Sequence, residues 1–388
     1  MEKFIKQIFV CILALGISFN HQFDVFAAPI PKPPNLKVTS YIIMDFNSGA
    51  IIASKNPDIE LPPASITKIM TSYLAFTELR DGSLKLDDKV LISKKAWKTP
   101  GSKMFIEVGK EVSVSHLLQG IVTSSGNDAS VAIAEHISGD VDTFSVYMNQ
   151  MGASLGLKNT NYTNPTGLPD KDLYTSAKDI AVLSRHLIKK FPGYYRLYSQ
   201  KEFVYGKSLE GKPIKQYSRN KLLYMDDRVD GIKTGYTKRA GYCLAASSKR
   251  GSRRLITVVL GAKTPGYRID ATKALFEYGF RFYETHKIFK KGSAVHNARV
   301  FNGEKREAKL GVEEDFFISI PRRLIKNIKK EFVIDRNINA PISKNAALGF
   351  VVIKFEGKVI SKAKLIALED IQEGNFYRRT IDSIQQIF

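Results

Sequence analysis

The stretch Leu61-Pro62-Pro63-Ala64-Ser65-Ile66-Thr67-Lys68-Ile69-Met70-Thr71 is the starting point for predicting the fold and the site of this chain. A helix is predicted from about Ser65, because apolar residues then recur at helical spacing: Ile66, Ile69, Met70, Tyr73 and Leu74. Positions three apart share a helix face, so the Lys68 amine is expected to reach the Ser65 hydroxyl. The free N–H groups and the dipole of a first turn would stabilise negative charge there. A helix cap with a solvated lysine has the same spacing, so this stretch alone does not establish a nucleophile.

Short apolar runs and turn signals on both sides of this stretch outline one large domain. A hairpin is expected before it, since two apolar runs flank Asn47-Ser48-Gly49, and residues 115–190 are mainly helical by periodicity. Three β-prone runs and a helix then follow, at 229–234, 241–248, 254–260 and 269–283. This order predicts an α/β (α+β) fold, in which strands from both ends of the domain form one antiparallel sheet flanked by helices.

Two further motifs carry side chains suited to peptide chemistry. Ser125-Gly126-Asn127 interrupts the helical middle. A Ser and an Asn on such a turn can donate to a substrate amide and relay a proton, although an ordinary helix N-cap uses the same residue types. Lys233-Thr234-Gly235 ends a predicted strand, where glycine lets a peptide substrate approach the backbone as an added strand would.

The three motifs together are far more specific than any one of them. The set S-x-x-K, S-D-N and K-T-G is the signature of class A β-lactamases and penicillin-binding proteins, and this chain has the three motifs in that order with Ser-Gly-Asn as the middle one. Together with their flanking residues, the motifs resemble those of the low-molecular-mass D-alanyl-D-alanine carboxypeptidases (penicillin-binding protein 5 type, peptidase family S11). The likeness continues through 278–285 to Gly374-Asn375-Phe376, and so covers nearly the whole mature chain. It implies a serine β-lactamase/D,D-transpeptidase-like catalytic domain that needs no cofactor.

The resemblance also implies roles for the first two motifs. Ser65 would be the nucleophile that forms an acyl-enzyme, and Lys68 would be its general base. Ser125 and Asn127 would shape a proton relay and hold the substrate. A free lysine is almost entirely protonated at pH 7, so Lys68 can act as a base only if burial and a second cation lower its pKa.

The third motif and its neighbours would complete the substrate-binding set, which comprises Lys233, Thr234, Gly235, Tyr236 and Arg268. By resemblance, Lys233 and Thr234 would bind the substrate carboxylate, and Lys233 would lower the pKa of Lys68. The backbone N–H groups of Ser65 and Tyr236 would form the oxyanion hole. Arg268 matches an arginine near the terminal carboxylate in the family, and a solvated arginine at a helix start is the alternative.

The implied activity is removal of the terminal D-alanine from the peptidoglycan stem pentapeptide, with roles in peptidoglycan maturation and cell shape. β-Lactam antibiotics would acylate the enzyme as covalent inhibitors. A β-lactamase of class A needs a glutamate after the middle motif, and residues 138–178 contain none. A D,D-endopeptidase of the same fold is the closer alternative, although the relatives associated with that activity lack a C-terminal β domain.

The first residues predict export. Residues 1–27 combine Lys3 and Lys6 with an apolar run and a small-residue cleavage site, as in a secretory signal peptide. Its removal leaves Cys243 without a disulfide partner, and this residue is expected to be a buried small hydrophobe. The formal charge of +21 on 388 residues favours anionic surfaces. An exported chain without a recognition motif is not expected to bind nucleic acid, and its scattered histidines predict no metal site.

The chain beyond the catalytic domain (36–288) changes texture. Short β-prone runs over 289–373 predict a small all-β domain. The tail, 374–388, is expected to form an amphipathic helix that lies in an anionic membrane surface, although packing on the β domain is the alternative. The predicted location is periplasmic, with the protein peripherally bound to the outer face of the cytoplasmic membrane.

Overall fold

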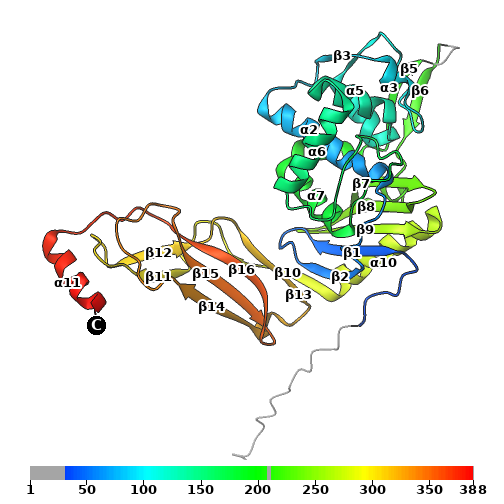
Figure 1. Cartoon of the computed structure of the whole chain (residues 1–388). Coiled ribbons are helices and arrows are strands. Elements are labelled where there is room, and N and C mark those ends of the chain that lie inside the picture. Colours follow the sequence, from blue (N-terminus) through cyan, green and yellow to red (C-terminus); the bar gives the residue numbers. More distant parts are fainter. Residues whose placement is uncertain (1–30, 208–210, 388) are drawn as a thin grey trace, which may run out of the picture. The chain divides into compact units, whose positions relative to one another are not determined.

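A five-stranded antiparallel sheet forms the centre of the catalytic domain in this computed structural model, which describes residues 31–207 and 211–387 (Figure 1). The strand order is β2-β1-β9-β8-β7, so the hairpin from the start of the domain pairs with the strands from its end. The strands are β1 (Ser40–Asp45), β2 (Ile51–Lys55), β7 (Val229–Thr237), β8 (Gly241–Arg250) and β9 (Arg253–Ala262). The predicted signal peptide lies outside the described residues.

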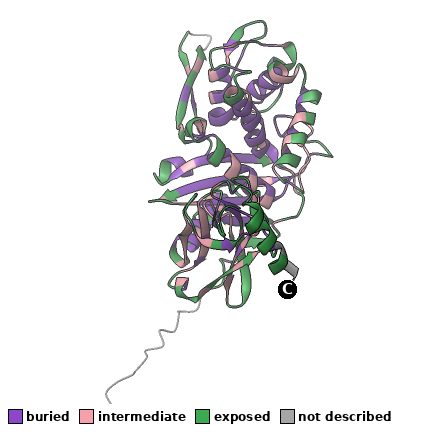
Figure 2. Cartoon of the chain, turned by 90° about the vertical axis from the view of Figure 1, so that its left-hand side faces the viewer, coloured by how far each residue is buried: buried purple, intermediate pink, exposed green. Residues whose placement is uncertain are grey.

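Helices cover both faces of this sheet, which explains why β1 is buried along its whole length. Side chains alternate across a strand, so Ile42 and Met44 join one apolar core while Tyr41 and Ile43 join another. The first core contains residues of α2 (Lys68–Asp81), α4 (Val114–Gln119), α5 (Asn127–Ser138), α6 (Val141–Ser154) and α7 (Ala177–Lys190). The second contains residues of α9 (Leu222–Met225) and α10 (Pro265–Phe282). Figure 2 shows the buried residues in these layers.

The helix α2 runs through the interior, with every residue from Lys68 to Thr77 buried. A helix that is buried all round needs few polar side chains, and its sequence fits. The predicted helix start at Ser65 is a 3-10 turn over Ala64–Thr67, and the α-helix proper begins at Lys68. The Ile66 N–H donates to the Pro63 carbonyl at 3.2 Å, an i to i+3 bond that tightens this first turn.

Smaller elements border the domain. Two two-stranded antiparallel sheets pair β3 (Lys89–Leu91) with β4 (Glu111–Ser113) and β5 (Glu202–Lys207) with β6 (Pro213–Tyr217). Short helical turns complete it: α3 (Lys94–Lys98), a π-helical turn at Gly120–Ser124, α8 (Pro192–Tyr195) and a 3-10 turn at Arg196–Ser199.

The C-terminal part is a separate β structure with its own apolar core. A two-stranded sheet pairs β10 (Tyr283–Phe289) with β13 (Phe316–Pro321), and a five-stranded sheet has the order β11-β12-β16-β15-β14. The strands of the latter are β11 (His296–Arg299), β12 (Glu307–Gly311), β14 (Ile328–Ile334), β15 (Ala347–Phe355) and β16 (Lys358–Ala367). The first strand of this C-terminal part, β10, begins at Tyr283, whereas the sequence analysis placed the domain boundary at 289.

The tail forms the helix α11 (Phe376–Ile387). Asp382, only 7% exposed, accepts a hydrogen bond from the Asn302 N–H at 2.8 Å, and Gln385 accepts one from Arg299. Phe376 and Tyr377 remain 79% and 75% exposed. None of the helices in the described part of the chain is long and apolar enough to cross a membrane. The predicted fold, an antiparallel sheet flanked by helices followed by an all-β domain, is confirmed.

Candidate active site

Ser65 and Lys68 come together at the start of α2, as the sequence predicts. Lys68 Nζ lies 3.3 Å from Ser65 Oγ and donates at 2.6 Å both to Asn127 Oδ1 and to the Thr166 carbonyl. A neutral amine has two hydrogens and one lone pair. Because two acceptors occupy the hydrogens, the lone pair is left for the Ser65 hydroxyl.

The surroundings of Lys68 favour that neutral form. Lys68 is fully buried, and this burial lowers its pKa well below the usual value. The positive charges of Lys233 and Arg219 lower the pKa further, while the carboxylate of Asp128 opposes them. The condition that the sequence set for a lysine base is therefore met in the structure.

Ser125 is placed by an unusual turn between two helices. It follows the π-helical turn Gly120–Ser124, has a left-handed backbone with φ of 63°, and immediately precedes the Gly126 cap of α5. This backbone conformation places the Ser125 hydroxyl next to the sheet. There Lys233 Nζ, on the sheet, donates to Ser125 Oγ at 2.9 Å. The site thus contains two pairs of a serine hydroxyl and a lysine amine, Ser65 with Lys68 and Ser125 with Lys233.

Lys233 and Thr234 lie on β7, the edge strand of the sheet. Burial, followed by the charges of Arg219 and Arg268, lowers the pKa of Lys233 to about 7. An edge strand has backbone groups without a neighbouring strand on its outer side, so it can receive an extended peptide.

The structure gives a further reason for a glycine at position 235, which is close packing. Gly235 lines the cleft, but a Cβ added there would lie 3.0 Å from the Pro63 carbonyl and 3.1 Å from Ala64 Cβ. Glycine therefore allows β7 to pack against the turn that carries Ser65.

Tyr236 and Arg268 border the same cleft. The half-exposed Tyr236 ring stacks on Tyr242 with centroids 4.3 Å apart. Arg268, from α10, is only 7% exposed and donates to the Cys243 carbonyl at 3.2 Å. Its Nε is buried without a hydrogen-bond partner, and no ion pair engages this arginine among the residues the structure describes. The predicted site residue is therefore a buried cation that still lacks an anion.

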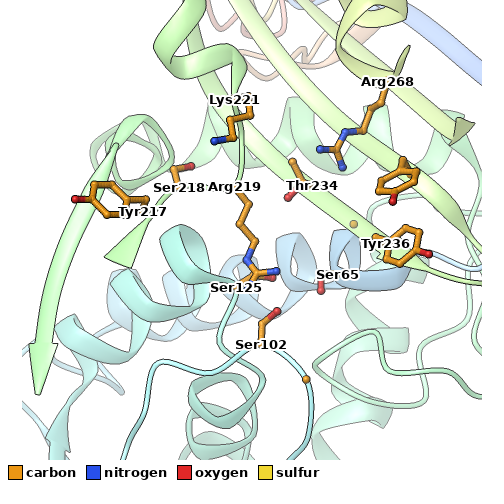
Figure 3. Close-up of a pocket in the computed structure, with 13 residues that line it drawn as sticks. Ser65, Ser102, Ser125, Tyr217, Ser218, Arg219, Lys221, Thr234, Tyr236 and Arg268 are labelled. Carbon is orange, nitrogen blue, oxygen red and sulfur yellow. The ribbon is translucent and has the colours of Figure 1, made fainter. Parts of the chain in front are cut away.

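One open cleft of about 740 Å³ is lined by six of the predicted site residues, namely Ser65, Ser125, Thr234, Gly235, Tyr236 and Arg268 (Figure 3). Lys68, Asn127 and Lys233 are buried and do not line it. The cleft also includes residues that the sequence analysis missed, namely Gly101, Ser102, Tyr217, Ser218, Arg219, Lys221 and Tyr242. Thr166, whose carbonyl binds Lys68, was missed as well, because a backbone carbonyl leaves no signature in a sequence. Arg219 lies in the short connection between β6 and α9 and belongs to no motif.

Residues 31–207 and 211–387 contain no group of three or more His, Cys, Asp or Glu side chains arranged to hold a metal ion. Cys243 is buried and unpaired, and burial raises the pKa of its thiol to about 11, so the thiol stays protonated. This agrees with its predicted role as a small hydrophobe.

Comparison with known proteins accounts for both parts of the chain. Residues 27–264 match the family model of peptidase S11, D-alanyl-D-alanine carboxypeptidase, and residues 283–373 match that of the penicillin-binding protein 5 C-terminal domain. D-alanyl-D-alanine carboxypeptidase DacA of Haemophilus influenzae is 40% identical over 381 residues, covering 96% of this chain and 94% of that protein.

Two further relatives bear on structure and activity. The crystal structure of penicillin binding protein 5 from Haemophilus influenzae has a TM-score of 0.83 at 41% identity, covering 88% of this chain and 100% of that one. The D-alanyl-D-alanine endopeptidase of Escherichia coli is 30% identical and matches 68% of this chain and 84% of its own length. Family, relatives and fold agree, and the chain belongs to the S11 family of D-alanyl-D-alanine carboxypeptidases.

Proposed function

We propose that this carboxypeptidase works through an acyl-enzyme on Ser65, with Lys68 as the general base. The observation that carries the proposal is the Lys68 amine, whose two hydrogens are bound by Asn127 and Thr166 and whose lone pair is left for Ser65. Neutral Lys68 takes the Ser65 proton as Oγ attacks the carbonyl carbon between the last two D-alanines. The N–H groups of Ser65 and Tyr236 would stabilise the resulting oxyanion.

Collapse of the tetrahedral intermediate requires a proton on the leaving nitrogen. Ser125 can donate its hydroxyl proton and be resupplied by Lys233, since Lys233 Nζ lies 2.9 Å from Ser125 Oγ. The C–N bond then breaks, D-alanine leaves, and the acyl group stays on Ser65. The proton that Lys68 took from Ser65 is released to solvent while Lys233 regains one, so that Lys68 is neutral again. Lys68 then takes a proton from the water that attacks the ester, and returns it to Ser65 Oγ as the ester C–O bond breaks.

Substrate binding would use the edge strand and the unpaired cations. The stem peptide adds beside β7, and its terminal carboxylate is bound by Thr234 and Arg268. A β-lactam carries a carboxylate next to a strained amide and would acylate Ser65 in the same way. The slow release of that acyl group fits the absence of Glu in 138–178.

The test is release of D-alanine from a stem pentapeptide. Wild type should release one D-alanine per peptide, and Ser65→Ala should release none while keeping its fold. Release by Ser65→Ala at the wild-type rate would contradict the proposal. Crosslinked dimeric muropeptide is the second substrate, and faster cleavage of it than of the pentapeptide would favour the endopeptidase alternative.

We also propose export to the periplasm and attachment to the outer face of the cytoplasmic membrane through α11. In support, polar Asp382 and Gln385 contact the β domain, while Phe376, Tyr377 and Ile384 stay exposed as an apolar surface. So short an apolar face gives modest and reversible binding, which should depend on anionic lipid and on salt.

A truncation tests this attachment. The mature chain should sediment with anionic liposomes at low salt, and a chain ending at Glu373 should not. Neutral liposomes serve as the control. Equal sedimentation of both chains on anionic liposomes would show that α11 is not the anchor.

A further inference from the structure

Arg219 is a cation in the active-site cleft that no motif predicts and no neighbour neutralises. It lines the cleft together with Ser65, Ser102 and Ser125 (Figure 3). Within residues 31–207 and 211–387, its guanidinium makes no hydrogen bond and no ion pair. Arg219 is exposed to solvent, and its side chain opens onto the cleft beside Ser125 and Ser102 (Figure 3).

The backbone that carries Arg219 is held firmly on both sides. The buried Ser218 donates its N–H to the Lys201 carbonyl at 2.7 Å, and the buried Asn220 side chain donates to the Gly231 carbonyl at 3.0 Å. Gly231 is on β7, two positions before Lys233. The backbone at Arg219 is thus fixed beside the strand that is to bind the substrate, which limits the positions that the guanidinium can reach.

The positive charge of Arg219 acts on the two lysines of the site. It lowers the pKa of both Lys68 and Lys233, so it lies close enough to repel their protonated forms. Asp128, the acid that acts on Lys68, is occupied by the backbone N–H groups of Met104 and Phe105. Among the described residues, Arg219 and Arg268 are thus two arginines of the cleft that no carboxylate pairs with, which favours the binding of an anion there.

Arg219 lies on the side of the cleft where the leaving group departs. The leaving nitrogen must be near Ser125, which Lys233 supplies with a proton, whereas Tyr236 lies further along β7. Figure 3 shows Arg219 on one side of Thr234 and Arg268 on the other, each from a different element. A carboxylate at Thr234 would have an arginine on either side.

We propose that Arg219 is a second carboxylate-binding arginine, which together with Arg268 and Thr234 holds the α-carboxylate of the leaving D-amino acid. A guanidinium offers paired N–H donors that match a carboxylate, and a second one increases the selectivity for a free chain end. This inference rests on the proposed function and names the group of the substrate that the additional cation recognises.

The test compares two substrates that differ only in the carboxylate. One is an acyl-D-Ala-D-Ala peptide, and the other is the same peptide with a C-terminal amide. Values of kcat/KM are taken on the alkaline plateau, where Lys68 is neutral in every variant, so that an effect through its pKa does not enter. Arg219→Gln should lose about tenfold on the acid, the size expected for one charge-assisted hydrogen bond, and much less on the amide.

Two further variants sharpen the comparison. Arg219→Lys should recover part of the loss on the acid, because it keeps the charge without the paired donors. Arg306→Gln removes the same charge from an exposed position in the β domain and should change neither substrate. Circular dichroism verifies that each variant is folded.

The outcomes separate this inference from the function beneath it. Equal losses on acid and amide, or no loss on the acid, would refute a contact between Arg219 and the carboxylate while leaving the carboxypeptidase mechanism in place. Failure of wild type to release D-alanine from the acid would refute the proposed function, and the inference with it.

Discussion

Asp128→Asn tests the link between the fold and the site. The buried Asp128 carboxylate accepts the N–H groups of Met104, Phe105 and Ala129 at 2.9–3.1 Å, which fixes the loop that crosses the cleft. In asparagine one oxygen becomes an NH₂ group, which leaves at least one of these donors without an acceptor and gives the others a neutral one. One unsatisfied buried donor and the weakened bonds together predict a loss of about 2–4 kcal/mol in the free energy of unfolding.

The assay is urea unfolding followed by the fluorescence of Trp97, the only tryptophan in the chain, which lies in α3 of the catalytic domain. Asp142→Asn removes an exposed carboxylate from α6 and should cost less than about 0.5 kcal/mol. The same substitution at Asp128 also removes a charge that raises the pKa of Lys68, so acylation by benzylpenicillin should persist to lower pH. Stability within about 0.5 kcal/mol of wild type, or a shift of the acid limb to higher pH, would refute this reasoning.

Three further predictions concern the lysines and the loop behind them. Lys68→Ala should abolish acylation by benzylpenicillin in stopped-flow measurements, and a rate near that of wild type would exclude it as the base. Lys233→Met should raise the free energy of unfolding at pH 7 by up to about 3–5 kcal/mol, since the pKa of Lys233 falls from 10.5 to about 7 on folding. Because the unfolded chain binds one proton more than the folded chain between pH 7 and 10.5, the free energy of unfolding of wild type should rise over this range. The difference in free energy of unfolding between Lys233→Met and wild type should therefore shrink. Urea titrations at several pH values that show a constant difference would contradict this. Gly167→Ala places a Cβ 1.8 Å from the Ala64 carbonyl and should slow acylation at least tenfold, whereas Gly82→Ala, with a similar positive φ and nothing within 4 Å, should only lower stability.

Those parts of the structure that depend on the pattern of apolar and polar side chains could be predicted from the sequence. Short apolar runs between turn residues located the hairpin and the three closing strands, and helical periodicity located the helical middle, because burial of apolar side chains determines all of them. Ser65, Lys68, Ser125, Asn127 and Lys233 could be chosen because the resemblance supplied three motifs in order, and the structure brings them within hydrogen-bonding distance.

Other parts could not be predicted because they depend on long-range geometry. Thr166 is 98 residues from Lys68 in the sequence, so only the folded structure brings its carbonyl to the Lys68 amine. Every residue has such a carbonyl, so the residue type gives no signal. Arg219 sits among many basic residues in a chain of charge +21, so its lack of a partner becomes visible only in three dimensions. The short helical turn at Ala64–Thr67 likewise follows from packing against β7 and not from local propensity.

The acyl-enzyme on Ser65 is tested most directly by mass spectrometry after treatment with benzylpenicillin. The intact protein should gain the mass of one penicillin molecule, and digestion should locate it on the peptide that contains Ser65. Ser65→Ala should remain unlabelled, and the label on wild type should persist for much longer than it takes to form. A label on another residue, or no label on folded wild-type protein, would contradict the assignment of Ser65 as the nucleophile.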